Sequence, residues 1–392
     1  MHYEEPVRTF LQIALALDSA VERRTGTAPL LSRETYSYGF DTPSWSWAEI
    51  GRRIDDVRAA LSGLPPARAA FISDLLAAFA VMVREGLGEA VPYAQRVEAF
   101  LQAPGRRVPG ETIEQLAGEL RRLLAEAGYP DDLAQAIPRW RAEQSVSGDE
   151  ADRMAQGFLA RAQQETQRRI APLPEGHQVA LTFPRNYPYH GYSYYSRNYQ
   201  GRVFLNGDID WQIPALKHTV CHEAFPGHQT YSALREYVFR QGRLPVEGTL
   251  YFSNTPITPL VEGMCEVGQE ALGMVETVHD QIYETYNRYT SAVSTNLAFD
   301  CNEGLMDKET AVTLLMEAAC ISRVFAEKRY HFWTHPLWCT GFPHYWYGRE
   351  FMRESYRRMQ GHHPAFFQMV YGQPHTVRSL REAMDAYLAA PA

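Results

Sequence analysis

Residues 171–211 read APLPEGHQVALTFPRNYPYHGYSYYSRNYQGRVFLNGDIDW, and they separate two long stretches with a helical pattern. The segments HQVALTF, GYSYY and RVFLNG are rich in β-branched and aromatic residues and are bounded by Pro, Gly and Asn, which is typical of short strands. The tyrosines of this stretch suit either the packed edge of a sheet or one wall of a substrate groove. The sequence therefore predicts a small β-sheet near the middle of the chain.

Helical patterns flank this stretch on both sides. Apolar residues recur at three-to-four spacing in segments such as VRTFLQIALALDSAVERR and FISDLLAAFAVMVREGL, and the pattern returns after Leu216. In the segment of residues 331–351, Pro336 and Pro343 are expected to break the helix. We therefore predict a mainly α protein, with a large helical body and a small β-sheet that flanks an active-site cleft. Residues 1–170 form a predicted N-terminal helical scaffold or cover, and residues 171–392 the second region.

Composition limits the classes of partner. The chain has 392 residues, of which 45% are hydrophobic and 21% charged, so a sizeable core is expected. Its formal net charge of -8 argues against nucleic acid or an anionic membrane as a partner, because no basic excess neutralises phosphates. A small neutral or cationic substrate is easier to accommodate, and no stretch is expected to approach the length of a membrane span. The oligomeric state stays open.

The cysteines and the first residues favour a cytoplasmic protein. The five cysteines form an odd set without C-x-x-C spacing, which is neither a disulfide framework nor a thiolate zinc site, so reduced thiols are expected. The first residues, MHYEEPVRTFLQIALALDSAVERR, carry acidic residues where a signal peptide needs basic ones.

The segment CHEAFPGHQTY, residues 221–231, contains the residue types of a zinc hydrolase. Such an enzyme needs three ligands, an open position for water and a carboxylate that takes the proton of that water. His222 and His228 offer two ligands and Glu223 the base, yet the histidines are six residues apart, whereas H-E-x-x-H places them four apart on one helix face. Pro226 and Gly227 are expected to break or widen the helix, so that both imidazoles converge. Alternatively, the two histidines merely flank a helix break.

A row of carboxylates follows in PLVEGMCEVGQEALG, where Glu262, Glu266 and Glu270 stand at successive four-residue steps on one helix stripe. Like charges on one face usually mark a solvated surface, but this helix is otherwise apolar. We expect the stripe to supply the third ligand. Glu266 lies one turn beyond Glu262, where it could hold a histidine from behind.

The HEAFPGH motif with the downstream EG resembles the bacterial family of H-E-x-x-P-G-H proteins placed with the gluzincin-type zinc metallopeptidases. The resemblance covers roughly the second half of the chain and implies a gluzincin-like fold, with residues 171–392 as the zinc-binding catalytic region. It implies that His222, His228 and Glu262 bind Zn²⁺ and that Glu223 is the general base.

The same resemblance implies further site residues. Tyr194, Tyr195 and Asn206 match the strands that precede the family's motif. The YWYG segment matches a C-terminal Tyr-x-x-Gly, so Tyr345, or its neighbour His344, is expected to donate to the oxyanion. The chain departs from the family's usual Trp, carboxylate, His and Lys at four positions, namely Met264, Gln269, Asn302 and Trp346.

These observations predict a zinc-dependent hydrolase, a peptidase or amidohydrolase that acts on a short peptide or amino-acid conjugate through a metal-activated water. Two other classes stay open. One is a helical metal-dependent oxygenase or lyase, in which Glu262, Glu266 and Glu270 help to hold iron. The other is a zinc-binding protein that has lost catalysis. Which end of a peptide is recognised, or whether the bond is a peptide bond, stays open.

Overall fold

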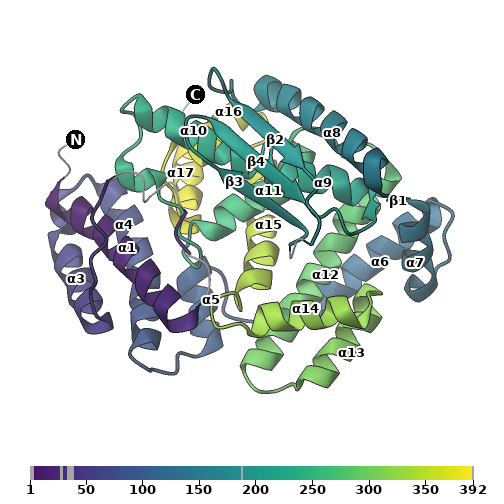
Figure 1. Ribbon diagram of the computed structural model, residues 1–392, viewed down its shortest axis with the longest axis horizontal. Helices are drawn as coiled ribbons and strands as arrows, with labels where there is room; N and C mark the ends of the chain where they lie inside the picture. The colour runs from purple at the N-terminus through teal and green to yellow at the C-terminus, as the bar shows by residue number, and fades with distance from the viewer. Residues whose placement is uncertain (1–3, 27–29, 33–38, 187–188, 391–392) are drawn as a thin grey trace. The chain divides into compact units, whose positions relative to one another are not determined.

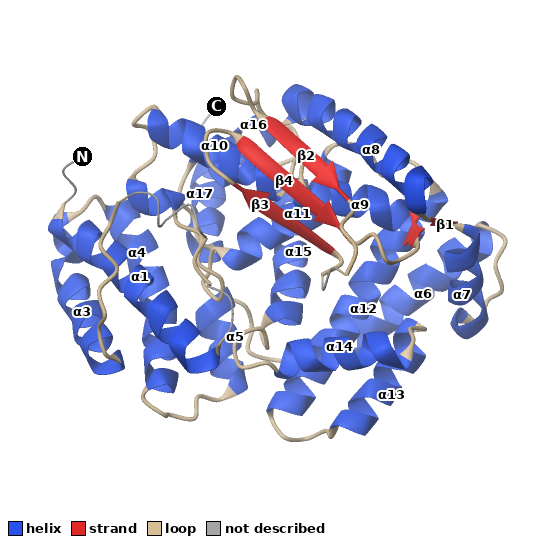
Figure 2. Ribbon diagram, viewed as in Figure 1, coloured by secondary structure: helices blue, strands red, loops and turns tan. Residues whose placement is uncertain are grey.

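The computed structural model describes residues 4–26, 30–32, 39–186 and 189–390. Most of these residues lie in helices, and a small sheet lies among them, so the predicted mainly α fold with a small sheet is confirmed (Figures 1 and 2). The chain divides into two compact units. Unit 1 contains residues 1–105, 234–260 and 357–392, and unit 2 contains residues 106–233 and 261–356. The predicted boundary near residue 170 stays a prediction.

Unit 1 is built from helices. Its elements are α1 (Glu5–Thr25), α3 (Trp47–Ala60), η1 (Leu61–Gly63), α4 (Pro66–Gly86), α5 (Tyr93–Leu101), η2 (Val246–Thr249), α16 (His363–Gly372) and α17 (Val377–Ala389). By length and composition alone, α4 could cross a membrane. The expectation that no stretch approaches the length of a membrane span is therefore wrong for this helix. Its Phe71, Ile72 and Phe79 are buried within the protein, and its buried Asp74 accepts a hydrogen bond from Thr376, as in a core helix.

Unit 2 contains the strands and the remaining helices. Its elements are α6 (Gly110–Glu126), α7 (Leu133–Glu143), β1 (Ser145–Val146), α8 (Gly148–Arg169), β2 (Gln178–Thr182), β3 (Gly191–Tyr195), β4 (Gln200–Leu205), β5 (Trp211–Gln212), α9 (Ile213–Glu223), α12 (Val278–Asn302), α13 (Lys308–Ala319) and α14 (Arg323–Thr334). Residues of both units occur in α10 (His228–Arg240), α11 (Thr258–Ala271) and α15 (Gly341–Arg358).

The sheet has three strands in the order β2-β4-β3, with β2 parallel and β3 antiparallel to β4. Along β4, Val203 and Leu205 are buried while Arg202 is exposed, which is the alternation of a strand with one face on a core. The buried face packs with α8 and α9 around Trp211, as Figure 1 shows for the elements beside the sheet. The sheet thus supports α9 from one side.

The aromatic segment of residues 331–351 is broken once. α14 ends at Thr334 and α15 begins at Gly341, so Pro336 lies in the break as predicted. Pro343 does not break a helix. It lies in the first turn of α15, where the absence of an N–H costs little because the first N–H groups of a helix have no intrahelical partner.

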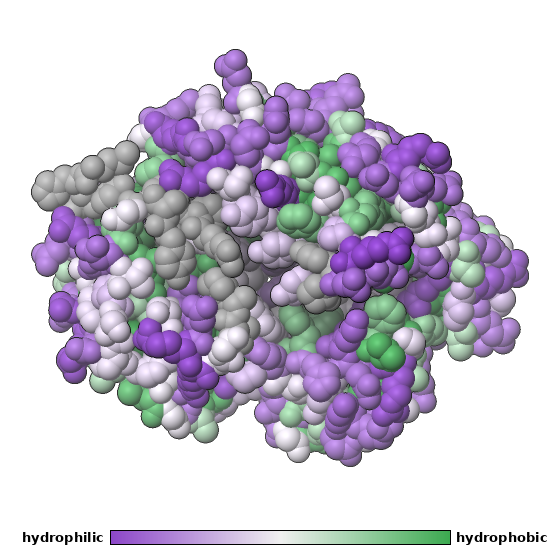
Figure 3. All heavy atoms as spheres, viewed as in Figure 1, coloured by the Kyte–Doolittle hydropathy of each residue, from purple (hydrophilic) through white to green (hydrophobic). Residues whose placement is uncertain are grey.

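Hydrophilic residues predominate on the face shown in Figure 3, and hydrophobic residues form separate patches there. The large hydrophobic side chains exposed in unit 2 include Leu305, Leu314, Val324 and Phe325. Exposed apolar side chains of this kind are ordinary for a globular domain. All five cysteines are free thiols, as predicted.

Candidate metal centre

The helix that contains His222 ends directly after the His-Glu pair. α9 ends at Glu223 and α10 begins at His228, so residues 224–227 form the predicted break. A Cβ on Gly227 would lie 1.7 Å from the carbonyl oxygen of His222, so only glycine fits there. The Gly227 N–H donates to the carbonyl of Cys221 at 3.1 Å, which fixes the turn. The break therefore follows from local backbone chemistry.

The break brings the two imidazoles together over one carboxylate. The ring centroids of His222 and His228 are 5.1 Å apart. Glu262 of α11 lies between them, with its two oxygens 3.5 Å from Nε2 of His222 and 3.6 Å from Nε2 of His228. Ligands about 2.1 Å from a tetrahedral zinc ion are about 3.4 Å from one another. The distance from each imidazole to the carboxylate therefore fits the spacing of ligands in a zinc site.

Two glycines set the position of α11. A Cβ on Gly263 would lie 2.2 Å from the carbonyl oxygen of Gly348 in α15, and one on Gly268 would lie 2.9 Å from Pro226. Backbone therefore packs on backbone at the first contact, and the Pro226 ring fills the second. The first contact holds α11 against α15, and the second holds it against the break that follows α9.

Glu266 holds His222 from the side opposite Glu262. Its Oε1 lies 3.2 Å from Nδ1 of His222, and Arg349 of α15 forms an ion pair with the same carboxylate. A carboxylate on Nδ1 favours the tautomer whose Nε2 lone pair is available to a metal. Nε2 is the atom that faces Glu262.

The charges of the cluster shift its pKa values in opposite directions. Burial opposes a charge on His222, but its contact with Glu262 and the charge of Glu223 outweigh burial and raise the pKa of His222. Burial also opposes a charge on Glu262, but His228 and His222 hold the pKa of Glu262 well below its usual range. Glu262 is therefore ionised at neutral pH, as a metal ligand must be.

Glu223 lies beside strand β3 instead of in the ligand set. A Cβ on Gly191 would lie 3.1 Å from Oε1 of Glu223 and 2.9 Å from the Thr219 methyl group, so the glycine permits this packing. Burial raises the pKa of Glu223, and the nearby His222 and His228 act against that rise. A raised pKa brings a carboxylate closer to the range in which it exchanges protons at neutral pH.

The aromatic end of α15 reaches the same cluster. Burial raises the pKa of Tyr345 well above its usual value, and the charges of Glu262 and Glu223 raise it further, so its phenol stays protonated. Both ring nitrogens of His344 are buried without a hydrogen-bond partner among the described residues, and burial lowers its pKa to about 4. These two neighbours on α15 are thus neutral side chains near the carboxylates.

The predicted substrate residues of the sheet have structural partners. The Tyr194 carbonyl accepts a hydrogen bond from Gln229 at 2.9 Å, and the Tyr195 hydroxyl accepts one from the N–H of Tyr199 at 3.2 Å. The Asn206 amide donates to the Tyr189 carbonyl. A contact of these residues with substrate stays a prediction.

Asn302 lies at the end of α12. Its amide group donates to the carbonyls of Ala298 and Trp333, both at 2.8 Å, and so joins the end of α12 to α14. Its predicted place near the site stays a prediction.

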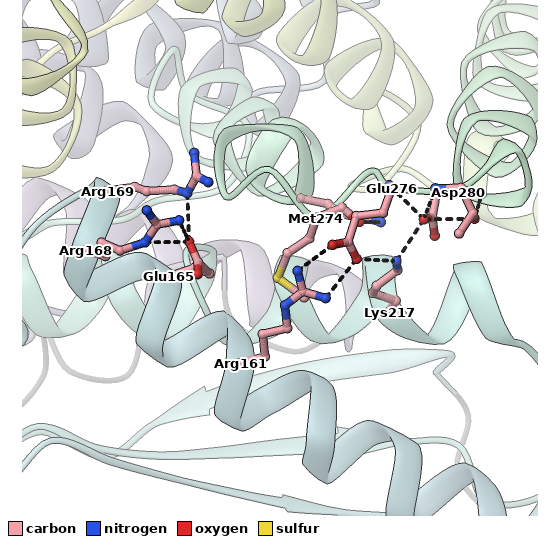
Figure 4. A network of polar contacts seen from close by, with 10 residues as sticks. Arg161, Glu165, Arg168, Arg169, Lys217, Met274, Glu276 and Asp280 are labelled. Carbon is pink, nitrogen blue, oxygen red and sulfur yellow. Dashed lines mark hydrogen bonds and ion pairs between the residues drawn. The ribbon is translucent and has the colours of Figure 1, made fainter.

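A separate polar cluster, the Lys217 network, anchors α9. Lys217 donates to Asp280 of α12 at 2.8 Å, and Arg161 of α8 donates to Glu276 at 2.8 Å, as Figure 4 shows. Asp280 also accepts hydrogen bonds from the backbone N–H groups of Glu276 and Thr277, both at 3.0 Å. These contacts fix the helix that contains both His222 and Glu223.

Three residues around this centre, His218, Cys265 and Arg349, were not predicted from the sequence. His218, one turn before His222, has Nδ1 3.0 Å from Glu284, and its Nε2 is 3.8 Å from Glu266. Its signal was the four-residue step to His222 on one helix face. Cys265 lies within 4.8 Å of the ligand nitrogens of His222 and His228, and it occurs on the same helix as Glu262. Arg349 gives no local signal, because only the tertiary fold pairs it with Glu266.

No family model matches the sequence, and no curated protein sequence matches it significantly. The fold is similar to the crystal structure of a "putative lipoprotein" from Colwellia psychrerythraea, with a TM-score of 0.62 and 14% identity, covering 92% of this chain and 70% of that chain. It is also similar to a "putative lipoprotein of unknown function" from Shewanella oneidensis, with a TM-score of 0.56 and 16% identity, covering 86% of this chain and 71% of that one. At these identities the likeness shows the fold alone.

These comparisons correct the family assignment. The assignment to H-E-x-x-P-G-H proteins of the gluzincin type is wrong, because no family model matches and both solved neighbours are described as lipoproteins, not peptidases. The terms protease, metallopeptidase and hydrolase gain no support from the neighbours. The physical reason is that a seven-residue motif fixes a local backbone and a set of donor atoms, and these do not define a family.

The expected cytoplasmic location is corrected as well. Both neighbours are described as lipoproteins, a class that is anchored to membranes, which contradicts a cytoplasmic assignment. An odd number of free cysteines describes the state of the thiols and does not fix a compartment. The acidic residues near the start were equally weak evidence.

Proposed function

We propose that His222, His228 and Glu262 bind a zinc ion and that the protein is a zinc-dependent hydrolase of an amide bond in a short peptide or amino-acid conjugate. The observation that supports this best is the carboxylate of Glu262, which lies 3.5 and 3.6 Å from the Nε2 atoms of the two imidazoles. Glu266 on Nδ1 of His222 adds the outer carboxylate that metal-binding histidines usually have.

Zinc supplies a Lewis acid that polarises a carbonyl and acidifies a water molecule. In the proposed reaction Glu223 accepts a proton from the attacking water and returns it to the leaving amine. Its burial supports this role because the raised pKa favours proton exchange near neutral pH. The protonated phenol of Tyr345 donates a hydrogen bond to the oxyanion.

We further propose that strand β3 and the start of α15 border the active-site cleft. Gly191 of β3 packs on Glu223, and Tyr345 of α15 lies near enough to Glu262 and Glu223 for their charges to raise its pKa. A substrate carbonyl beside Glu223 would therefore lie between these two elements.

Elemental analysis of the purified protein tests the metal site. The parent should contain near-stoichiometric zinc, whereas His222→Ala and Glu262→Ala should lose it because each removes a ligand. Glu270→Ala is the matched control on the same helix. Glu270 is paired with Arg353 at 3.4 Å, so its loss should leave the zinc content unchanged. Zinc that persists in Glu262→Ala would exclude this ligand set.

The identity of the metal and turnover of a peptide library separate the other classes. Iron in place of zinc would favour the oxygenase or lyase. Near-stoichiometric zinc without turnover would favour a zinc protein that has lost catalysis. Hydrolysis that depends on both zinc and Glu223 would support the proposed enzyme.

A further inference from the structure

Arg329 of α14 is partly buried, and it differs from two neighbouring arginines of unit 2, the buried Arg349 and the partly buried Arg288. Arg349 forms an ion pair with Glu266, and Arg288 donates to Glu350 at 2.8 and 2.9 Å. Nη1 of Arg329 is buried without a hydrogen-bond partner, and no carboxylate within the described ranges pairs with its guanidinium. A buried N–H donor without an acceptor is costly, so Nη1 of this cation suits an anion that arrives from outside the chain.

Two series of neighbouring side chains link Arg329 to the candidate metal centre. Its guanidinium lies over the ring of Phe342, 5.5 Å from the centroid, and Phe342 lies 6.3 Å from the ring of Tyr345. On another side, burial raises the pKa of Tyr283 and the charge of Arg329 acts against that rise, while Tyr283 lies 5.3 Å from the ring of His218. Both Tyr345 and His218 belong to the surroundings of the cluster.

The chemistry of the side chain indicates the class of ligand. A guanidinium presents paired N–H donors that match the two oxygens of a carboxylate, and the Phe342 ring restricts the plane of the guanidinium. Arg141, a partly buried cation of the same unit, already donates to the carbonyls of Cys320 and Ala319 and to the hydroxyl of Tyr286. Of these arginines of unit 2, Arg329 is thus the one that has no carboxylate or hydrogen-bond acceptor at its guanidinium among the described residues.

We propose that Arg329 binds a carboxylate of the substrate and selects amide substrates that carry a free carboxylate beside the scissile bond. The choice of substrate rests on the proposed hydrolysis, whereas the binding of the carboxylate does not require turnover. This local preference for an anion contrasts with the net charge of -8, which by itself favours a neutral or cationic substrate.

Calorimetric binding of N-benzoylglycine and N-benzoylglycinamide to the metal-free protein tests the proposal. The two probes have the same shape and differ in the charge of one end. Without metal, a carboxylate cannot gain affinity by binding zinc. A charge-assisted contact should make the acid bind at least about tenfold tighter than the amide. Arg329→Gln should abolish this ratio, and Arg329→Lys should retain part of it.

Arg323→Gln is the matched control, because Arg323 is exposed on the same helix and is paired with Glu309. It should leave the ratio of the parent unchanged, and circular dichroism should show all variants folded. Equal affinity of the two probes for the parent, or a preference that survives in Arg329→Gln, would overturn the proposal. Hydrolysis of uncharged amides as fast as of amides with a free carboxylate would also overturn the role of Arg329. The proposed zinc-dependent hydrolysis would still stand.

Discussion

Two buried polar clusters adjoin α9, and they are built differently. In the Lys217 network the ammonium group has Asp280 at 2.8 Å, and Asp280 accepts further hydrogen bonds from backbone N–H groups at 3.0 Å. In the second cluster, the His–Glu cluster of His222, His228, Glu262 and Glu266, the Glu262 oxygens lie 3.5 and 3.6 Å from the imidazole nitrogens. Those distances are too long for good hydrogen bonds and suit a shared ion.

The difference separates a structural role from a functional one. A network whose donors and acceptors satisfy one another fixes helices and needs no ligand. A cluster in which carboxylates and imidazoles converge at the spacing of metal ligands is stabilised best by a bound cation. Substitutions in the two clusters should therefore change different quantities.

Glu223→Gln should give the largest effect of all. The amide keeps the shape of the side chain but cannot accept a proton, so kcat should fall by about 10²–10⁴-fold. Zinc content should stay near that of the parent, because Glu223 packs on Gly191 and is not part of the proposed ligand set. Turnover and elemental analysis of the same sample measure both quantities. Parent-like turnover would reject Glu223 as the general base.

Lys217→Met should unfold the protein more easily without changing its chemistry. The side chain of Lys217 is only 8% exposed and that of Asp280 2%, so the substitution leaves a buried carboxylate without its counter-ion. The free energy of unfolding should fall by about 3 kcal/mol. Urea unfolding measures it, and zinc per folded chain should not change.

Arg161→Met is the control within the same network. Its ion pair with Glu276 is 46% and 38% exposed, so its loss should cost at most about 1 kcal/mol. If Lys217→Met and Arg161→Met lower the free energy of unfolding equally, burial does not determine the strength of the ion pairs in the Lys217 network.

A third buried imidazole sharpens the contrast with His222. His177 lies edge-on to Phe225 at 5.4 Å, and both of its ring nitrogens lack a hydrogen-bond partner within the described part of the chain. Burial alone lowers its pKa to about 4, whereas the carboxylates around His222 raise the pKa of that residue. The unfolded chain therefore binds a proton on His177 more readily than the folded one between about pH 6.5 and 4.

His177→Phe should remove this part of the pH dependence. The stabilising effect of a neutral His177 is complete above about pH 6.5 and is lost as the pH falls toward about 4, by up to about 3 kcal/mol. Urea unfolding at several pH values should give a flatter slope for the variant than for the parent. Identical slopes would mean that His177 titrates normally in the folded protein.

The structural features that depend on neighbouring residues along the chain could be predicted from the sequence. Apolar spacing predicted the helices, and composition predicted the three central strands. The Pro226-Gly227 pair predicted the break, because glycine and proline act on their own turn. The four-residue step also predicted that Glu266 would lie behind a histidine, and its Oε1 is 3.2 Å from His222.

Contacts between helices that are distant in the chain could not be predicted from the sequence. The pairing of Glu266 with Arg349 joins α11 to α15, and the charge of Arg329 on α14 acts on Tyr283 of α12, so neither relation has a local pattern. Seven residues that match a motif also led to a family assignment that the comparisons contradict. Local chemistry was reliable here, and inference from resemblance was not.

Cys265→Ser should have the smallest effect, and it decides between two ligand sets. The Cys265 Sγ lies within 4.8 Å of ligand nitrogens of His222 and His228, so a site of two histidines and one thiolate also fits the geometry. A metal binds the thiolate, and burial, with the charges of Glu262 and Glu223 adding, raises the pKa of Cys265 well above its usual value. Glu262 is ionised already and contacts both imidazoles.

We therefore expect Cys265→Ser to change the zinc dissociation constant by less than about tenfold, and Glu262→Gln to weaken binding by more than the roughly 10–100-fold typical of outer partners. Competition with a chelator of known affinity measures both constants. Serine is close in size to cysteine, and glutamine to glutamate. Neither variant should therefore disturb the packing around α11 enough to explain a difference in zinc affinity. Loss of zinc in Cys265→Ser, with retention in Glu262→Gln, would assign the third ligand to the thiolate. Glu262 would then be an outer carboxylate that holds the histidines, and the His–Glu cluster would resemble the Lys217 network more than proposed.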